Sequence, residues 1–170
     1  MVTVSRRSVI VLAALGSIVL LAAGIMFGPT LLSSDEVSPD LTAAERATVD
    51  ILGPDETVRG TLEVRLATTS QERYTGLSDT ASLGPNEGML FVHETMGEYA
   101  YVMRDMDFPI DIVFVDTDGR ITRIHHAETE EPPLQRYRGR GIWVLETPFH
   151  WTTDHDVLVG DRVRIRSVRG

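Results

Sequence analysis

The chain has 170 residues, a formal net charge of −9 and no cysteine. The lack of cysteine excludes disulfides, thiol catalysis and thiolate metal sites. The acidic charge disfavours binding to the phosphates of nucleic acids. Every basic residue is an arginine. An acidic chain without lysine is typical either of adaptation to high salt, which screens like-charge repulsion, or of a biased genome composition.

An uncharged apolar segment, residues 9–27 (VIVLAALGSIVLLAAGIMF), lies close to the N-terminus. As a helix it would be about 28 Å long, close to the ~30 Å hydrocarbon layer of a membrane. Arg6 and Arg7 precede the segment and the first acidic residue, Asp35, follows it. Because positive charge stays inside, we expect a cytoplasmic N-terminus (residues 1–8), a single-pass membrane anchor and an extracytoplasmic C-terminal domain.

The arginine pair stands in the sequence SRRSVI, which resembles a twin-arginine export signal. No A-x-A cleavage site is evident after Phe27, which favours a retained anchor. Secretion after cleavage of a signal peptide is the alternative. Residues 28–53 are polar and contain Pro29 and Pro39, so we predict a linker, with a short helix over residues 42–49.

Residues 54–170 form the predicted exported domain, in which short stretches alternate apolar and polar residues as β-strands do. We predict strands over residues 58–67, 89–93, 99–103, 110–116, 120–127, 142–146 and 162–168. Asp118-Gly119 is a hairpin signal between two of them. The spacings leave no room for the repeated crossover helices of a parallel sheet.

Helical signals in this domain are few. A short helix is predicted over residues 70–77 with Ser70 as its N-cap, and a short helix or turn over residues 147–156. Residues 128–141 are predicted to be a long polar loop. We therefore expect a mainly antiparallel α+β domain of about seven short strands and one or two short helices, barrel-like or built from two sheets.

Ordered sequence blocks between Val58 and Arg166 resemble the domain of unknown function 192 family. The blocks are Arg73 with Gly76-Leu77, Glu87–Val92, Tyr101–Asp105, Phe108–Asp116, Asp118-Gly119, Trp143–Glu146 and Gly160-Asp161. One block departs from the family, which usually has Phe-Trp-Met-Lys-Asn-Thr where this chain has YVMRDM at residues 101–106. Any aromatic stacking or amide hydrogen bond of that block is therefore lost here. The resemblance implies no established activity, but similar members are often exported or membrane-anchored.

Residues 104–111, where two apolar stretches meet, contain charged side chains and Pro109. Proline has no N–H and belongs at a strand start or edge, whereas a carboxylate just inside a strand needs partners. We expect Asp111 to pair with Arg73 and Arg104, near Glu146. The expected ligand-binding site consists of Arg73, Met103, Arg104, Asp105, Asp111 and Glu146.

Three roles are open for this cluster: an ion-pair cluster that stabilises the turn, a pocket for a small polar or anionic ligand, and acid–base catalysis by Asp111 and Glu146 in a hydrolase-like enzyme. No nucleophile motif or glycine-rich phosphate loop accompanies the two carboxyl groups. We therefore favour a non-catalytic binding or accessory module for such a ligand or for a cell-envelope partner, without a cofactor. The sequence does not predict its oligomeric state.

A metal-binding module is a further alternative. His125 and His126 point to opposite faces of a strand and cannot easily share one ion. His150 and His155 are five residues apart, a loose spacing for a ligand pair. Soft ligands for copper(I) could come from His93, Met96, Met103 and Met106, although core packing explains methionines more simply.

Overall fold

The computed structural model describes residue 41 and residues 45–169 of the chain. The predicted cytoplasmic segment, membrane anchor and twin-arginine signal, and most of the predicted linker, lie outside the described residues. Within residues 41 and 45–169, no helix is long and apolar enough to cross a membrane.

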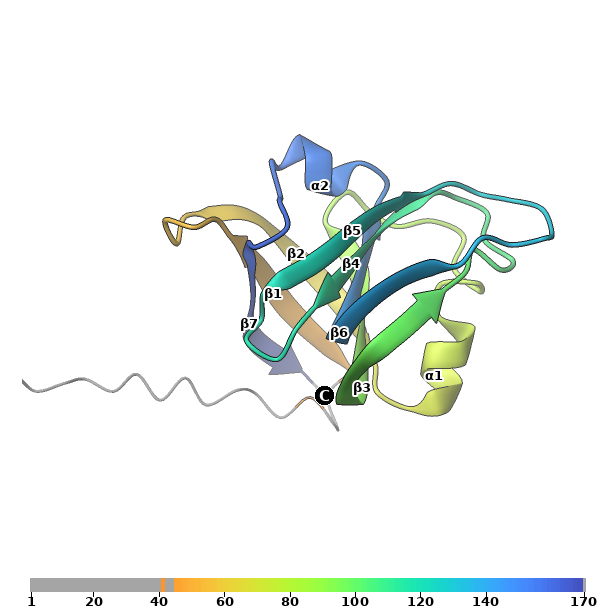
Figure 1. The fold of residues 1–170 in the computed structure, drawn as a ribbon, viewed down its shortest axis with the longest axis horizontal. Helices are drawn as coiled ribbons and strands as arrows, with labels where there is room; N and C mark the ends of the chain where they lie inside the picture. Colours follow the sequence, from red (N-terminus) through yellow and green to blue (C-terminus); the bar gives the residue numbers. More distant parts are fainter. Residues whose placement is uncertain (1–40, 42–44, 170) are drawn as a thin grey trace, which may run out of the picture. The chain divides into compact units, whose positions relative to one another are not determined.

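Seven strands of the described chain form one sheet in the order β5-β4-β6-β3-β2-β1-β7. They are β1 (Arg46–Leu52), β2 (Val58–Ala67), β3 (Glu87–Tyr101), β4 (Ile110–Val115), β5 (Ile121–Ala127), β6 (Tyr137–Pro148) and β7 (Arg162–Arg169). The sheet curls into a half-barrel (Figure 1). An isolated bridge between Arg120 and Arg162 joins the starts of the two edge strands, β5 and β7.

All neighbouring strands are antiparallel except β2 and β3, which pair in parallel. A parallel pair needs a crossover connection, and here the crossover carries helix α1 (Ser70–Thr75). The second helix, α2 (Trp151–Asp154), lies between β6 and β7. The predicted fold, a mainly antiparallel domain of about seven strands and two short helices, is confirmed. The Asp118-Gly119 hairpin joins β4 to β5 as predicted.

The helix predicted over residues 42–49 is wrong, because β1 begins at Arg46. Ala47, Val49 and Ile51 are buried at alternate positions, as a strand requires. The strand pairs with β2 on one side and β7 on the other, and the side chains on its other face are buried too. The sheet therefore begins inside the segment predicted to be a linker.

Strands β3 and β6 are longer than the sequence predicts. β3 is one strand where two shorter ones are expected, and β6 begins at Tyr137, inside the predicted loop of residues 128–141. The C-terminal end of β3 pairs with the N-terminal end of β6, beyond a register shift between Val92 and Gly97. Gly139 permits this pairing, since an added Cβ would overlap the Phe114 ring.

Two apolar cores lie on the two faces of the sheet. One receives side chains from all seven strands, such as Leu62, Leu90 and Val113, and fills the inside of the curl. The other lies mainly on β3, β4 and β6, and includes Phe114 and Leu77, the latter from the chain after α1. Because successive side chains point to opposite faces, adjacent residues of β4 belong to different cores.

Candidate functional site

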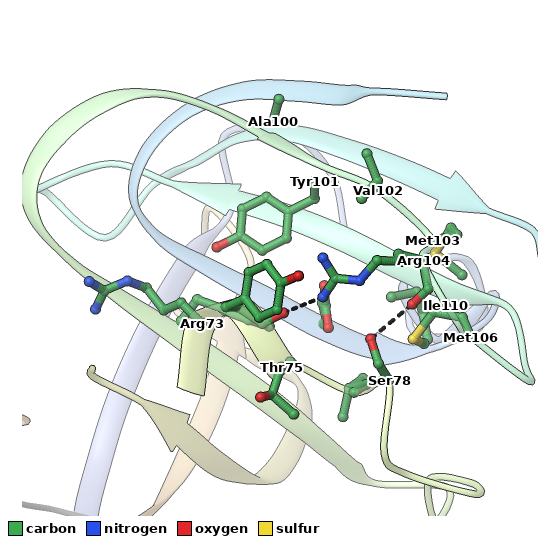
Figure 2. Close-up of a pocket in the computed structure, with 15 residues that line it drawn as sticks. Arg73, Thr75, Ser78, Ala100, Tyr101, Val102, Met103, Arg104, Met106 and Ile110 are labelled. Atoms are coloured by element: carbon green, nitrogen blue, oxygen red, sulfur yellow. Dashed lines mark hydrogen bonds between the residues drawn. The ribbon is translucent and has the colours of Figure 1, made fainter. Parts of the chain in front are cut away.

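A pocket of about 200 Å³ opens between α1 and the connection that follows β3. Figure 2 shows residues of both segments around it. Phe91, Met103 and Ile110 contribute apolar surface from the second core, whereas Arg104 and Glu146 contribute charged or ionisable groups.

The wall made by α1 is fixed at both ends of the helix. Thr69 is the N-cap and forms a capping box with Glu72: the Thr69 hydroxyl accepts the Glu72 N–H, and the Glu72 carboxylate accepts the Thr69 N–H. The prediction of Ser70 as N-cap is therefore wrong by one residue, although the T-x-x-E spacing was readable. Gly76 ends the helix at φ 56°, a conformation that favours glycine.

Glu146 lies near the end of β6, between Met89 of β3 and Ile112 of β4. It is only 6% exposed, yet it lines the pocket. Within the described part of the chain, its side chain forms no hydrogen bond or ion pair. Burial raises the pKa of Glu146 to about 8, because an apolar environment disfavours the charged form. The carboxyl group is therefore mostly protonated at pH 7.

A tyrosine and a histidine form a second polar group beside the pocket. The Tyr101 hydroxyl, which lines the pocket, lies 3.0 Å from His93 Nε2. Burial, and secondarily the charge of Arg73, lowers the pKa of His93 to about 4. Burial, followed by the nearby Glu146, raises the pKa of Tyr101. The neutral imidazole can thus accept the hydrogen bond of a protonated phenol, while its ring stacks on Tyr99 at 3.5 Å between centroids.

The two arginines of the site donate to backbone oxygens, and Arg104 has in addition a long ion pair with the exposed Asp105. Arg73 donates to the carbonyl oxygens of Thr68 and Val92, the latter at 2.9 Å. Arg104 donates to the Tyr74 carbonyl at 2.6 Å, and its guanidinium carbon lies 4.1 Å from the centroid of the Tyr74 ring. In Figure 2 the Arg104 side chain extends across the pocket, whereas the Arg73 side chain extends out of it. Arg104 therefore links the connection after β3 to α1.

Four of the six predicted site residues, Arg73, Met103, Arg104 and Glu146, line this one pocket. Asp105 does not line it: its side chain is 80% exposed and lies 3.8 Å from Arg104 Nε. Ser78 fixes the backbone between them by donating to the Arg104 carbonyl at 2.8 Å.

Asp111 lies elsewhere, and the expectation that it pairs with Arg73 and Arg104 is wrong. Its pairing partner on β6 is Thr147, whereas Glu146 pairs with the next residue of β4. Because paired residues of adjacent strands share a face and successive residues alternate, Asp111 and Glu146 face opposite sides of the sheet.

The Asp111 carboxylate is completely buried and accepts four hydrogen bonds. Oδ1 accepts from His126 Nδ1 at 2.7 Å and from the His150 N–H at 3.0 Å. Oδ2 accepts from the N–H and the hydroxyl of Thr152, the former at 2.9 Å. These contacts fasten the α2 segment to the sheet. The contact between Asp111 and His126 was not predicted from the sequence, because it depends on a register shift between β4 and β5 that places His126 opposite Asp111.

In the described ranges of the chain, no group of three or more histidine, aspartate or glutamate residues could hold a metal ion. His126 and His150 do approach each other, at 5.4 Å between ring centroids. His125 contacts the Arg138 carbonyl at 2.8 Å, and His155 stacks on Trp151 at 4.1 Å.

Comparison with known proteins places these observations in a family. The family model for DUF192, described as Uncharacterized ACR, matches residues 53–165. A crystal structure of a protein from Sinorhizobium meliloti 1021, provisionally described as a transcription regulator, has 25% identity and a TM-score of 0.66, and the match covers 72% of this chain and 95% of that one.

A second crystal structure is similar, that of a protein of unknown function from Novosphingobium aromaticivorans DSM 12444. It has 26% identity and a TM-score of 0.62, and the match covers 75% of this chain and 90% of that one. No curated protein matches the chain.

Proposed function

This chain belongs to the DUF192 family, and we propose that its domain is a non-catalytic module that binds a small polar molecule in the pocket beside α1. The family and the structural neighbours supply no activity, so the proposal rests on the pocket. The observation that carries it is Glu146, a buried carboxyl group that lines the pocket and has no partner among the described residues.

Glu146 is open to the pocket but has no partner among the described residues. A ligand that hydrogen-bonds to Glu146 would give this carboxyl group a partner while covering apolar surface of Phe91, Met103 and Ile110. The pocket volume of about 200 Å³ limits the size of such a ligand. Since a water molecule occupies ~30 Å³ of liquid, the pocket suits a ligand of fewer than roughly ten non-hydrogen atoms.

Two other functions have less support. Acid–base catalysis by Asp111 and Glu146 would need both carboxyl groups at one place, but they face opposite sides of the sheet. The regulator description of the Sinorhizobium protein does not extend to this chain, because a net charge of −9 disfavours binding to DNA.

We also propose that the domain acts outside the membrane, tethered through residues 9–27. The support comes from the sequence: an uncharged segment of membrane-spanning length with two arginines before it and all acidic residues after it. Fusion of a periplasm-dependent reporter to the C-terminus tests this placement, since only an exported C-terminus would give reporter activity. Activity of a reporter that works only in the cytoplasm would contradict it.

Binding can be tested with the full chain in detergent micelles, with ¹³C-labelled methionine methyl groups as NMR probes. Met103 and Met106 line the pocket, and Met96, which does not, is an internal control. A library of small polar compounds should contain members that shift the Met103 and Met106 signals and leave the Met96 signal in place. If no compound shifts the pocket signals at millimolar concentration, the proposed function is wrong.

A further inference from the structure

The pocket surrounds its one carboxyl group with aromatic and apolar surface. Glu146 is the acidic residue of the lining, and Phe91, Tyr74 and Tyr101 contribute rings. Aromatic faces attract cations, and a single carboxylate is the natural partner of a single cation. Neither Arg73 nor Arg104 forms an ion pair with Glu146 within the part of the chain that the structure describes. The pocket therefore contains a carboxyl group that no described residue pairs with and that a cation could ionise.

From this arrangement we infer that the ligand is a small primary amine, bound as its ammonium ion against the ionised carboxylate of Glu146. This inference rests on the proposed binding function and names its ligand class. An ammonium group has three N–H donors and no acceptor, which matches a carboxylate with no hydrogen bond from the described residues.

A small carboxylate fits the pocket less well. It would place a second negative charge, or a shared proton, beside Glu146 in surroundings that stabilise charge poorly. Arg73 is held by the backbone oxygens of Thr68 and Val92, and Arg104 by that of Tyr74, so neither guanidinium is free to turn fully toward an anion. The anionic alternative raised by the sequence is therefore disfavoured.

The charged and titratable groups that face Glu146 are Arg73 and Tyr74 from α1, Tyr101 from β3, and Arg104 from the connection after it. The flanking residues on β3 and β4 are apolar. The two guanidinium groups repel a cation, and the net charge of −9 attracts it over longer distances. The ion pair with Glu146 must therefore supply the affinity.

Binding of an ammonium ion is coupled to the release of a proton from Glu146. Burial raises the pKa of Glu146 to about 8, so near pH 7 the free pocket holds a carboxylic acid. An alkylamine in water is already an ammonium ion, since its pKa is about 10. The Glu146 O–H bond breaks on binding and its proton leaves to solvent, so one ammonium ion enters for each proton released. Affinity should rise roughly tenfold per pH unit between about pH 6 and 8.

Isothermal titration of the full chain in micelles with n-butylamine, n-butyramide and n-butyrate tests this inference. The three probes differ in charge at nearly constant size. Titrations at pH 6, 7 and 8, in phosphate and in MOPS, neither of which is a primary amine, report affinity and the number of protons released. Butylamine should bind most tightly, release close to one proton at pH 7, and shift the Met103 and Met106 methyl signals.

Glu146→Gln should weaken butylamine binding roughly 30-fold or more, because a buried charge loses its partner, and should abolish proton release. Glu98→Gln, on an exposed part of β3 outside the pocket, is the matched control and should change neither.

The possible failures separate the two proposals. If butyramide or butyrate binds in the pocket more tightly than butylamine, or if butylamine binds without proton release, the amine assignment is overturned and the binding function stands. Unchanged butylamine affinity in Glu146→Gln also overturns the amine assignment. If neither these probes nor the wider library shift the pocket methyl signals, both proposals fail.

Discussion

Two buried carboxyl groups lie on adjacent strands of this domain, on opposite faces of one sheet, and their surroundings differ. Asp111 is 0% exposed and accepts four hydrogen bonds, two of them from backbone N–H groups. Glu146 is 6% exposed and accepts none from the described residues. The contrast shows that burial alone does not mark a binding group. The missing partner distinguishes Glu146, whereas Asp111 serves the fold.

The largest expected effect is on the Asp111 side of this comparison. Asp111→Ala leaves the N–H groups of His150 and Thr152 buried without their acceptor, so we expect a loss of about 3–5 kcal/mol in the free energy of unfolding, measured with urea. Asp105→Ala, at an exposed position, is the control and should change stability by less than about 0.5 kcal/mol. A loss below about 1 kcal/mol in Asp111→Ala would show that α2 is held without this carboxylate.

Glu146→Gln should raise the free energy of unfolding at alkaline pH, whereas Asp111→Ala lowers it. The unfolded chain releases the proton near the ordinary glutamate pKa of 4.5 and the folded chain near 8, so the native state binds more protons in that range and stability falls as pH rises. Gln does not titrate. We expect the variant to be more stable by about 2–4 kcal/mol at pH 8, the upper value being the full linkage between these two pKa values, and its pH profile to be flatter. A variant that is less stable than wild type at pH 8 would contradict the account.

A smaller effect comes from His93, whose contribution to stability decreases as the pH falls, whereas that of Glu146 decreases as the pH rises. The unfolded chain takes up a proton near pH 6.5 and the folded chain near 4, so stability falls as pH falls through this window. The ring is only half-buried, so solvent screening limits the effect to about 1 kcal/mol. His93→Gln should remove it and leave the falling profile of Glu146 more visible between pH 4.5 and 6.5. Identical urea midpoints of wild type and variant across this pH range would contradict the proposed contribution of His93 to stability.

Much of the fold could be predicted from the sequence because its signals are local. The Asp118-Gly119 hairpin, the alternation in β2 and β7 and the apolar run of β4 depend on neighbouring residues. Strand β1 was missed because alanine, glutamate and arginine at its start favour a helix. Its pairing with β2 is local, but its second partner, β7, lies more than a hundred residues away, so only one of its two pairings could be found in the local sequence.

The candidate site was predictable only in part, for a related reason. Met103 and Arg104 follow β3 and Arg73 lies in α1, so the parallel crossover brings them together. The face on which Asp111 lies depends on the register between β4 and β6, because a shift of one residue exchanges the two faces. His126 could not be found by counting from the hairpin, because a register shift between Phe114 and Val115 moves the partner of Asp111 from His125 to His126.

The central claim is that Glu146 is a buried, unpartnered carboxyl group that a ligand can ionise. Its most direct test is a pH titration of the Glu146 side-chain carboxyl carbon by ¹³C NMR, without and with n-butylamine. The account predicts a midpoint near 8 in the free protein and a clearly lower midpoint with saturating amine. A midpoint near 4.5, the ordinary value for a glutamate, unchanged by the amine, would contradict it.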